Sequence, residues 1–490
     1  MKSILILGVY YGVLMILTAF AAHRFLLVRT LTRHPVADPT VPAPFEWPSL
    51  TVQLPVFNEP AVIRRLIEAV NRLEYPVAFT VQILDDSTDS TPTLVRDVLA
   101  SLPPPGKLRF RHMRRTDRSG FKAGALAAGL AASPDEVFVI FDADFVPPVD
   151  FLLRTVPHLC ASETTGMVQA RWSHLNPSES LLTFVQSCFL DSHFSVESAA
   201  RFRAGHFFNF NGTAGAWKRT ALEDAGGWSS DTVTEDLDIS YRAQQAGWRF
   251  VYLDETAASA ELPASLSSFQ GQQFRWAKGS IQTGRKLLPS ILSAPLSFST
   301  RLEATVHLTN NLSWLLTVLL SLLIVPAVII RWEAGLILPF VLDALLLMMS
   351  TTSLLLFYRT GHLKTKGTEL TRSQLFLVFL FGIGMSASNS AAVLSGLATR
   401  GGVFNRTRKT GGTRSVSSTT PRVPVAEVLL ATWFFFAIPV MMSVGAWIGV
   451  VFTTLFAMSY SIAIGFASAE WWTWFRHRAG RASGLRPEAI

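Results

Sequence analysis

The sequence predicts an α/β domain of the Rossmann-like type between an N-terminal transmembrane helix and a C-terminal α-helical transmembrane bundle. Hydrophobic residues make up 49% of the chain and charged residues only 16%, which is too little polar surface for most soluble enzymes. The apolar residues are concentrated towards the two ends, with a mixed sequence between them. Within the mixed part, β-type runs alternate with helical ones, which favours an α/β sheet with right-handed crossovers.

Residues 4–22 are uncharged and long enough to cross a bilayer. A signal peptide is the alternative, but basic residues follow the apolar run and no clean small-residue cleavage site is present. We therefore expect an N-terminal transmembrane anchor over residues 1–33 with its N-terminus outside. The Pro-rich linker 34–48 should be extended.

The mixed part over residues 49–289 is expected to be the soluble domain. Its predicted strands are 50–55, 80–84, 108–113, 137–141 and 167–172, and its predicted helices include 61–72, 91–101 and 122–132. Regular alternation of this kind indicates one parallel or mostly parallel sheet.

Residues 290–475 should form the membrane bundle with interfacial helices, a cytoplasmic basic loop at 399–425 and a basic cytoplasmic tail at 476–490. Apolar runs occur near 306–330, 335–357, 374–397, 427–447 and 448–469. If all five crossed the membrane, the basic loops 358–372 and 400–425 would lie on opposite sides, against the positive-inside rule. We therefore predict that the serine-rich segment 374–397 dips into the membrane or lies at its interface, which leaves five full spans.

The net charge of +8 is compatible with nucleic-acid binding. However, the surplus lies beside the apolar runs, where basic clusters mark the cytoplasmic side and attract anionic lipid. We expect membrane lipids as partners and no nucleic acid. The two cysteines, Cys160 and Cys188, indicate no disulfide framework and fit a reducing compartment.

Carboxylates follow two of the predicted strands. Asp85 and Asp86 directly follow the strand at 80–84. Ligands bind at this end of the strands in open α/β sheets. An ordinary Asx turn with a helix cap is the alternative. Asp142 and Asp144 follow the strand at 137–141, and alternation places both on one side of an extended backbone. Such a pair suits Mg²⁺ or Mn²⁺ bridging diphosphate oxygens, the alternative being two solvated acids in a surface loop.

Two further polar groups precede or begin predicted helices. The run Thr234–Asp238 opens a helix that extends to Ala246, so its acids are either capping residues or include a general base, for which we choose Asp236. In the run Gln272–Trp276, Arg275 offers a planar donor fork for diphosphate and Trp276 a flat face for a sugar ring. An interfacial helix with Arg and Trp at headgroup level is the alternative, and both can hold.

In this order and spacing, the four groups resemble the D, DxD, TED and QxxRW motifs of the processive glycosyltransferases of family two, which include cellulose, chitin and hyaluronan synthases. The chain looks most like the plant cellulose synthase-like A and C branch, which makes mannan, glucomannan and the xyloglucan backbone. The similar stretches are VQLPVFNE (52–59), VQILDDSTD (81–89), GFKAGAL (120–126), FDADFVPPVDFL (141–152), VQARW (168–172), FNGTAGAW (210–217), TEDLDISYRA (234–243) and QQFRW (272–276). The resemblance covers about residues 49–289.

The resemblance implies a GT-A type nucleotide-sugar domain with defined residue roles. Asp85 and Asp86 would contact the nucleotide base and ribose, with Lys122 nearby. Asp142 and Asp144 would hold the diphosphate and its metal, Mg²⁺ or Mn²⁺. In the TED motif, Glu235 and Asp236 would be the catalytic pair, with Asp236 as the base.

It also implies roles for the acceptor side. Gln272, Gln273, Arg275 and Trp276 would frame the diphosphate and the terminal acceptor sugar. The FNGT stretch, Phe210, Asn211, Gly212 and Thr213, would line the acceptor path. The stretch 404–409 looks like the cytoplasmic gating motif of the family, in which Phe404, Thr407 and Lys409 match and Arg408 replaces a proline common in near relatives. The AKGS that follows the QxxRW motif departs from the plant branch and leaves the sugar open.

The expected protein is an inverting, processive glycosyltransferase in the cell inner or plasma membrane, with its catalytic domain cytoplasmic. It would move hexose from UDP-glucose or GDP-mannose to a growing β-glycan and couple this to export. A non-processive enzyme that makes a glycolipid is the nearest alternative, and a transporter with a soluble regulatory domain is the alternative from another class. Asp343, Asn310 and Asn311 are candidates for lining a glycan channel, although Asp343 could equally be a buried structural residue. The sequence points to no particular accessory or oligomeric partner.

Overall fold

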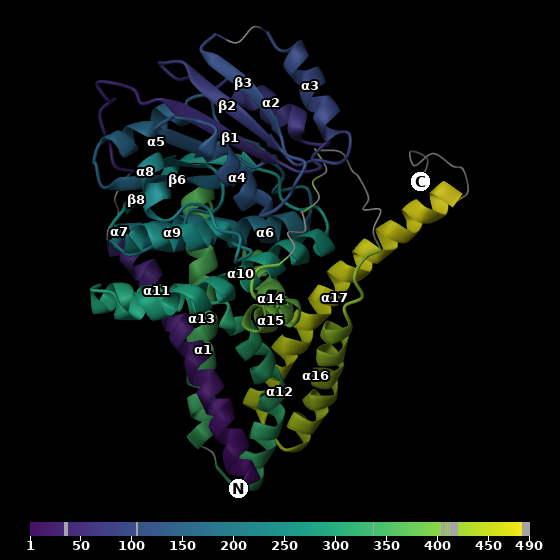
Figure 1. Ribbon diagram of the computed structural model, residues 1–490. Helices are drawn as coiled ribbons and strands as arrows, with labels where there is room; N and C mark the ends of the chain where they lie inside the picture. Colours follow the sequence, from purple (N-terminus) through teal and green to yellow (C-terminus); the bar gives the residue numbers. More distant parts are fainter. Residues whose placement is uncertain are drawn as a thin grey trace.

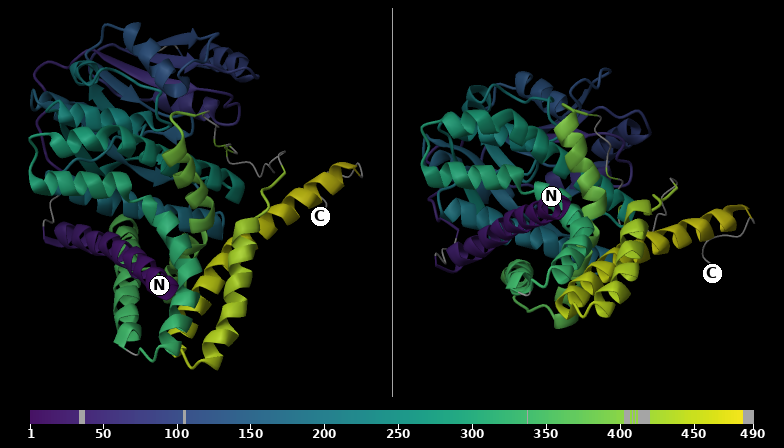
Figure 2. Two further views of the ribbon diagram at one scale, coloured as in Figure 1. Left: turned by 60° about the horizontal axis from the view of Figure 1, so that its bottom comes forward. Right: turned by 90° about the horizontal axis from the view of Figure 1, so that it is seen from below.

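The computed structural model describes residues 1–33, 38–103, 106–336, 338–402, 407, 409, 411 and 420–482. Figure 1 shows an α/β domain above a bundle of long helices, with the first helix, α1 (Lys2–Arg33), descending from the domain to the far end of the bundle. The last helix, α17 (Trp447–Ala482), runs up from that end and extends away from the body of the molecule, as both views of Figure 2 also show. The layout predicted from the sequence, a domain between apolar ends, is present.

The domain contains one sheet of eight strands in the order β3-β2-β1-β4-β7-β6-β8-β5. The strands are β1 (Leu50–Val56), β2 (Phe79–Asp85), β3 (Leu108–Arg114), β4 (Val137–Ile140), β5 (Phe145–Val146), β6 (Thr165–His174), β7 (Gly215–Lys218) and β8 (Arg249–Ala260). Strands β1 to β4 are parallel to one another, β7 runs antiparallel to β4 and β6, and β8 is parallel to β6. All five predicted strands are confirmed, and their carboxyl ends meet at one edge of the sheet.

The central strands are buried along nearly their whole length, as parallel strands covered on both faces are. The side-chain amides of two glutamines in these strands form hydrogen bonds inside the domain. Gln53 donates its amide to Gln82 (3.1 Å), and Gln82 donates to the carbonyl of Gly129 (3.0 Å). A Cβ at Gly129 would lie 2.4 Å from the Gln53 Nε2. The glycine therefore lets its helix approach the sheet closely enough to pair these amides.

The helices of the domain include those predicted at 61–72, 91–101 and 122–132. They are α2 (Ile63–Val70), α3 (Thr91–Ser101), α4 (Phe121–Ala131), α5 (Phe151–Cys160), α6 (Leu181–Ser192), α7 (Ala199–Arg203), α8 (Arg219–Asp224) and α9 (Glu235–Gln245). Helix α6 passes without a break into a π-helix, η1 (His193–Ser198), and then into α7.

Below the sheet, two helices precede the long bundle helices. They are α10 (Leu266–Ser293) and α11 (Phe298–Thr309), and Figure 1 shows α11 lying across the foot of the domain. The bundle continues with α12 (Leu312–Glu333), α13 (Leu338–Lys366), α14 (Arg372–Gly384), α15 (Ser386–Ala398), α16 (Val425–Ser443) and α17. Among the residues that the structure describes, five helices, α1, α12, α13, α16 and α17, are long and apolar enough to cross a membrane.

Helices α14 and α15 form a pair bent by 41°, which fits either a broken span or a re-entrant loop. The break falls inside the segment 374–397 that we expect to dip into the membrane, so the count of five full spans stays a prediction. Most of the basic loop expected at 399–425, and the end of the tail, lie outside the described residues.

Asp343 does not have the channel-lining role considered for it. Its carboxylate pairs with Arg331 (2.7 Å) and accepts a hydrogen bond from the Tyr10 hydroxyl (2.9 Å), while Arg331 also donates to Tyr11 (2.6 Å). These contacts join α1, α12 and α13. Removing one partner of a buried pair is costly, so the cluster fixes how these three helices pack.

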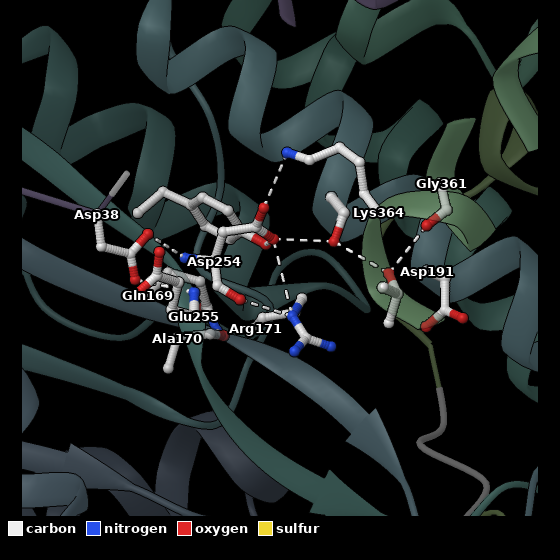
Figure 3. A network of polar contacts seen from close by, with 12 residues as sticks. Asp38, Gln169, Ala170, Arg171, Asp191, Asp254, Glu255, Gly361 and Lys364 are labelled. Carbon is white, nitrogen blue, oxygen red and sulfur yellow. Dashed lines mark hydrogen bonds and ion pairs between the residues drawn. The ribbon is translucent and has the colours of Figure 1, made fainter. Parts of the chain in front are cut away.

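A second polar network holds the end of α13 against the sheet (Figure 3). The carboxylate of Asp254, in β8, pairs with Lys364 (3.0 Å) and accepts a hydrogen bond from Ser195 (2.8 Å). The carboxylate of Asp38 accepts the backbone N–H groups of Asp254 (2.8 Å) and Glu255 (2.9 Å). Strand, π-helix and bundle helix are thereby joined, and the domain is docked on the bundle through specific contacts.

Candidate active site

The carboxyl ends of β1, β2 and β4 open into a cleft, which we call the charged cleft, with a volume of about 180 Å³. Its lining includes Asp86, Lys122, Asp142, Asp144, Glu235, Asp236, Arg275, Trp276, Thr407 and Lys409. These residues come from segments that are far apart in the sequence, and the parallel strands bring the first of them to one edge. The expected convergence of the acidic motifs and Trp276 on one cleft is therefore present.

The two carboxylates of the DxD motif do not lie on an extended strand, as alternation predicts. Strand β4 ends at Ile140, and a turn follows in which the Phe145 N–H donates to the Asp142 carbonyl (3.0 Å). The turn lets each carboxylate meet a different cation. Asp142 pairs with Lys122 (2.5 Å) and Asp144 pairs with Lys409 (2.6 Å).

This carboxylate pair suits a hard divalent cation such as Mg²⁺ or Mn²⁺, which prefers oxygen ligands. Two ammonium groups already lie against the two carboxylates, so the position attracts positive charge. Within the part of the chain that the structure describes, no group of three or more His, Cys, Asp or Glu side chains could hold a metal ion. A cation at Asp142 and Asp144 would therefore need further ligands from a substrate or from water.

Lys122, near the start of α4, is the central cation of the cleft. Its Nζ contacts Asp142, donates to the carbonyl of Gly212 (2.9 Å) and lies 3.9 Å from Glu235. Burial disfavours the charge of Lys122, but the neighbouring carboxylates of Asp142 and Glu235 outweigh it and raise its pKa. A fixed positive charge thus joins the DxD turn to the start of α9.

Asp236 lies in the first turn of α9, next to Glu235. Burial, followed by the charge of Glu235, raises the pKa of Asp236 to about 7, against the opposing effect of Lys122. A carboxylate with a pKa near the working pH is suited to general-base catalysis. Gly212, at φ 81°, packs against it so closely that a Cβ there would lie 2.9 Å from the Asp236 Oδ2.

Helix α10 brings Arg275 and Trp276 to the cleft. Burial lowers the pKa of Arg275 to about 10, and its guanidinium donates to the Thr407 hydroxyl (3.0 Å). The ring of Trp276 lies 6.4 Å from that of Trp172, which in turn lies 5.0 Å from that of Phe194. The cleft therefore has cations on one side and an aromatic wall on the other.

A second hollow, the membrane-side cavity, has a volume of about 410 Å³ and extends from the charged cleft into the bundle. The two share several lining residues, namely Trp172, Leu190, Asn211, Thr234, Asp236, Gln272 and Trp276. Its far end is lined by Leu455 and Phe456 of α17, and its wall includes Asn310 and Asn311, as we expected. Asp236 therefore stands where a cleft in the domain meets a cavity between the membrane helices.

Comparisons with known proteins agree with this geometry. The family described as glycosyltransferase like family 2 matches residues 48–279. The chain contains a family 2 glycosyltransferase domain. The probable glucomannan 4-beta-mannosyltransferase 7 of Oryza sativa subsp. japonica is 42% identical over 254 residues, which are 51% of this chain and 43% of that protein. The glucomannan 4-beta-mannosyltransferase 2 of Arabidopsis thaliana is 40% identical over 262 residues, 53% and 49% of the two chains.

Matches to these relatives span less than half of the relatives' own length. Among solved structures, the mannosyltransferase PcManGT of Pyrobaculum calidifontis, in complex with GDP-Man and Mn²⁺, superposes with a TM-score of 0.53 at 21% identity. The match covers 80% of this chain and 99% of that one. At this identity the likeness establishes the fold, and the GT-A type α/β domain that the motifs imply is confirmed.

Within the glycosyltransferase domain, Asp85 and Asp86 have different surroundings. Asp86 lines the charged cleft, where Arg115 binds it through two nitrogens (2.8 and 2.5 Å). Asp85 lies behind the lining and is fully buried, so the structure does not place it for the nucleotide contact implied by the resemblance. Despite burial, hydrogen bonds from His112 and Ser87 lower its pKa, and Asp85 therefore holds the turn that presents Asp86.

The residues of the FNGT stretch also differ in their surroundings. Asn211 and Gly212 line the charged cleft, whereas Phe210 is buried in the core against Trp217, with ring centroids 5.7 Å apart. Thr213 is buried as well and accepts the Asp142 N–H (2.9 Å). Phe210 and Thr213 therefore lie behind the lining of the charged cleft, and the acceptor-path role implied for them by the resemblance is not what their positions suggest.

The remaining expected residues divide between the two hollows. Gln272 lines both, and Gln273 lines only the membrane-side cavity. Of the gating-type motif, Thr407 and Lys409 line the charged cleft, and Phe404 lies outside the described residues.

Sequence reasoning missed Arg115, Arg118, Trp172 and His193. Arg118 lines the charged cleft with its guanidinium 3.4 Å from the Phe57 ring centroid. The basic run at 114–118, directly after a strand, is a signal that could have found Arg115 and Arg118. Trp172 lies two residues before the end of β6, and the position of His193 is known only from the fold.

Proposed function

We propose that this chain is an inverting hexosyltransferase that moves a sugar from a nucleotide-sugar donor to a glycan. The observation that carries this is the position of Asp236 between the charged cleft and the membrane-side cavity. A donor in the cleft and an acceptor from the cavity would meet at this carboxylate. GDP-mannose is the first donor to test, because the plant relatives are named as mannosyltransferases, and UDP-glucose is the second.

In this reaction Asp236 removes the proton of the attacking acceptor hydroxyl, the new C1–O bond forms, and the bond from C1 to the diphosphate breaks. One displacement inverts the configuration and needs one base. Lys122 and Arg275 lie where they can stabilise the charge that develops on the diphosphate. Mg²⁺ or Mn²⁺, held by Asp142 and Asp144, would neutralise the leaving diphosphate further.

The membrane-side cavity supports a coupled export of the product. It continues from Asp236 into the bundle, and its wall combines aromatic rings with asparagine side chains. Rings pack on the apolar faces of sugars and amides bind hydroxyl groups without fixing a charge. We propose that the growing glycan occupies this cavity, which makes repeated addition possible without release.

We further propose that the domain lies on the cytoplasmic side of the cell inner or plasma membrane. The basic residues that follow the first span support this orientation. In a Cys160→Ser background, a Thr420→Cys variant should react with a membrane-impermeant maleimide only after the cytoplasmic side is opened. Labelling of intact cells would reverse the orientation.

The function is tested with the full chain in membranes, supplied with labelled GDP-mannose or UDP-glucose. We expect polymer that is degraded by a linkage-specific mannanase or glucanase, and loss of its formation in excess chelator. Failure to transfer sugar from either donor would contradict the proposal. A lipid-linked product of one or two sugars would instead identify a glycolipid-forming enzyme.

A further inference from the structure

A series of charged side chains begins at Glu197 in the wall of the membrane-side cavity and leads towards α1 and α11. Glu197 of η1 lies 3.6 Å from Arg201, Arg201 donates to Glu303 (2.8 Å), and Glu303 contacts His23 (2.7 Å). Such ions are costly to move out of water. Packing alone rarely repays that cost, so a charge series that ends at a cavity points to a ligand there.

The end of the series at the cavity lies on the π-helix η1. Both His193 and Glu197 are in this element, and both line the membrane-side cavity. π-Helical turns are rare and are often found at functional sites. Neither residue has a role in the transfer step described above.

His193 links Glu197 to the acceptor side of the site. Its Nδ1 lies 3.1 Å from the Glu197 Oε2, and its Nε2 lies 2.9 Å from the Asn211 Oδ1. The Asn211 Oδ1 also accepts a hydrogen bond from the Asn209 Nδ2 (3.0 Å). The same nitrogen of Asn209 donates to the Phe210 carbonyl (3.1 Å). His193 therefore bridges Glu197 and Asn211 through its two ring nitrogens.

Glu197 presents a carboxylate oxygen to the cavity. The hydrogen bond with His193 and the closest approach of Arg201 are both at Oε2, and among the described residues no side chain is hydrogen-bonded to Oε1. Its side chain is 14% exposed. Burial opposes its charge, but His193 and Arg201 outweigh this effect and lower the pKa of Glu197. The residue is thus an ionised acceptor that its neighbours hold in place.

Aromatic rings line the same part of the cavity. Trp172, Phe194 and Trp276 contribute to its wall, and the first two rings lie 5.0 Å apart. A neutral saccharide has apolar C–H faces, which pack on rings, and hydroxyl groups, which donate to carboxylates with the strength of charge-assisted hydrogen bonds. The combination favours a sugar ring over a lipid chain, which has hydrocarbon to pack on the rings but no hydroxyl group to donate to the Glu197 Oε1.

We propose that Glu197, held by His193, binds hydroxyl groups of the sugar unit behind the terminal acceptor sugar and so positions the glycan for Asp236. This inference rests on the proposed function. It makes Glu197 a binding residue and His193 a positioning residue, and both act on the acceptor side of the charged cleft.

The test measures saccharide binding without donor, so that it does not depend on turnover. The purified full chain is titrated with mannohexaose and with cellohexaose, and separately with GDP and UDP. Loss of a charged hydrogen bond should weaken binding of the preferred oligosaccharide about tenfold or more in Glu197→Gln, with nucleotide affinity unchanged. His193→Gln, which keeps one donor, should lose less.

Glu303→Gln is the matched control. It removes a carboxylate from the same charge series, but Glu303 lines neither cavity. We expect it to lower the thermal stability and to leave saccharide affinity as in the wild type. Should Glu197→Gln fail to fold, the comparison of His193→Gln with Glu303→Gln provides the same contrast.

The proposal is overturned if the wild type binds neither oligosaccharide, if Glu197→Gln binds like the wild type, or if Glu303→Gln loses as much affinity. A failure of the proposed function looks different. In that case the wild type would transfer no sugar from any donor, while Glu197-dependent binding of an oligosaccharide would still support this saccharide site.

Discussion

The charged cleft and the membrane-side cavity share Asp236 but are built from opposite chemistry. In the cleft, carboxylates and cations from separate chain segments face one another in pairs, such as Asp142 with Lys122 and Asp144 with Lys409. The cavity is lined mainly by apolar and aromatic side chains, with Asn310 and Asn311 in its wall. Buried charges need partners of opposite sign, and the proposed function places the diphosphate on this charged side.

This difference separates two kinds of defect. Changes in the charged cleft should alter the chemical step or donor binding, whereas changes deep in the cavity should alter product length. Asp236 belongs to both, so its loss should have the largest effect.

We expect Asp236→Asn to lower the transfer rate about 10²- to 10⁴-fold, the usual contribution of a general base. Binding of the nucleotide should be retained, which calorimetry can measure. Asp238→Asn is the control, because Asp238 lies in the same helix and pairs with Arg242 and Lys286 outside both cavities. It should lower stability and leave the chemical step nearly intact. Retained turnover in Asp236→Asn would remove this residue as the base.

Gly212→Ala should lower the rate about a hundredfold, the effect of displacing a reacting group by about 1 Å. The new Cβ would meet the Asp236 Oδ2 at 2.9 Å and the Lys122 Nζ at 3.3 Å. Gly205→Ala provides the comparison, since Gly205 has a similar positive φ (69°) and nothing within 4 Å of the added atom. If both variants lose the same activity, backbone strain and not the contact with Asp236 is responsible.

The transfer rate should fall as the pH is lowered through about 7. Burial and Glu235 raise the pKa of Asp236 to about 7, so below that pH the carboxyl is increasingly protonated and cannot accept a proton. The rate should decrease about tenfold per pH unit on the acid side. A pH profile of kcat/KM for the donor tests this, and a flat profile between pH 6 and 8 would contradict it.

The smallest effect on chemistry is expected from Ser350→Trp, which places an indole in the wall of the membrane-side cavity. Chain length should decrease, measured by size-exclusion chromatography of labelled product, while a single sugar addition proceeds at a near wild-type rate. Met348→Trp, two residues away on the same helix but 60% exposed, should leave the length unchanged. Equal product lengths in the two variants would show that the glycan does not pass Ser350.

The sequence predicted the parts of the fold that depend on local pattern. The runs of β2 and β4 are buried and mainly apolar, and the acids that follow them were correctly expected at one edge. Strand β8 was not predicted: its first five residues, RFVYL, are a β-type run, but the remaining seven, DETAASA, have no apolar run. Strands β5 and β7 are only 2 and 4 residues long. These three strands form through pairing with neighbours distant in the sequence.

The sequence predicted the site residues that belong to recognisable motifs. The structure brings together the five residues that were expected to converge, Asp86, Asp142, Asp144, Asp236 and Trp276. The motifs could not show which of the neighbouring side chains point into the core of the domain and not into the cleft. Phe210 and Asp85 are adjacent to lining residues and are nevertheless buried, since alternate positions along an irregular chain face opposite ways. The pairing of His193 with Asn211 depends on a π-helical turn, which no local sequence pattern predicts.

The central claim is that one continuous path joins the charged cleft to the membrane bundle at Asp236. Electron cryomicroscopy of the full chain, purified from cells that make its product, tests this directly. We expect density for a glycan that fills the membrane-side cavity past Asn311, with its terminal sugar within about 3 Å of the Asp236 carboxylate. A cavity that holds only lipid, with product density leaving the domain on its membrane-distal side, would contradict the account.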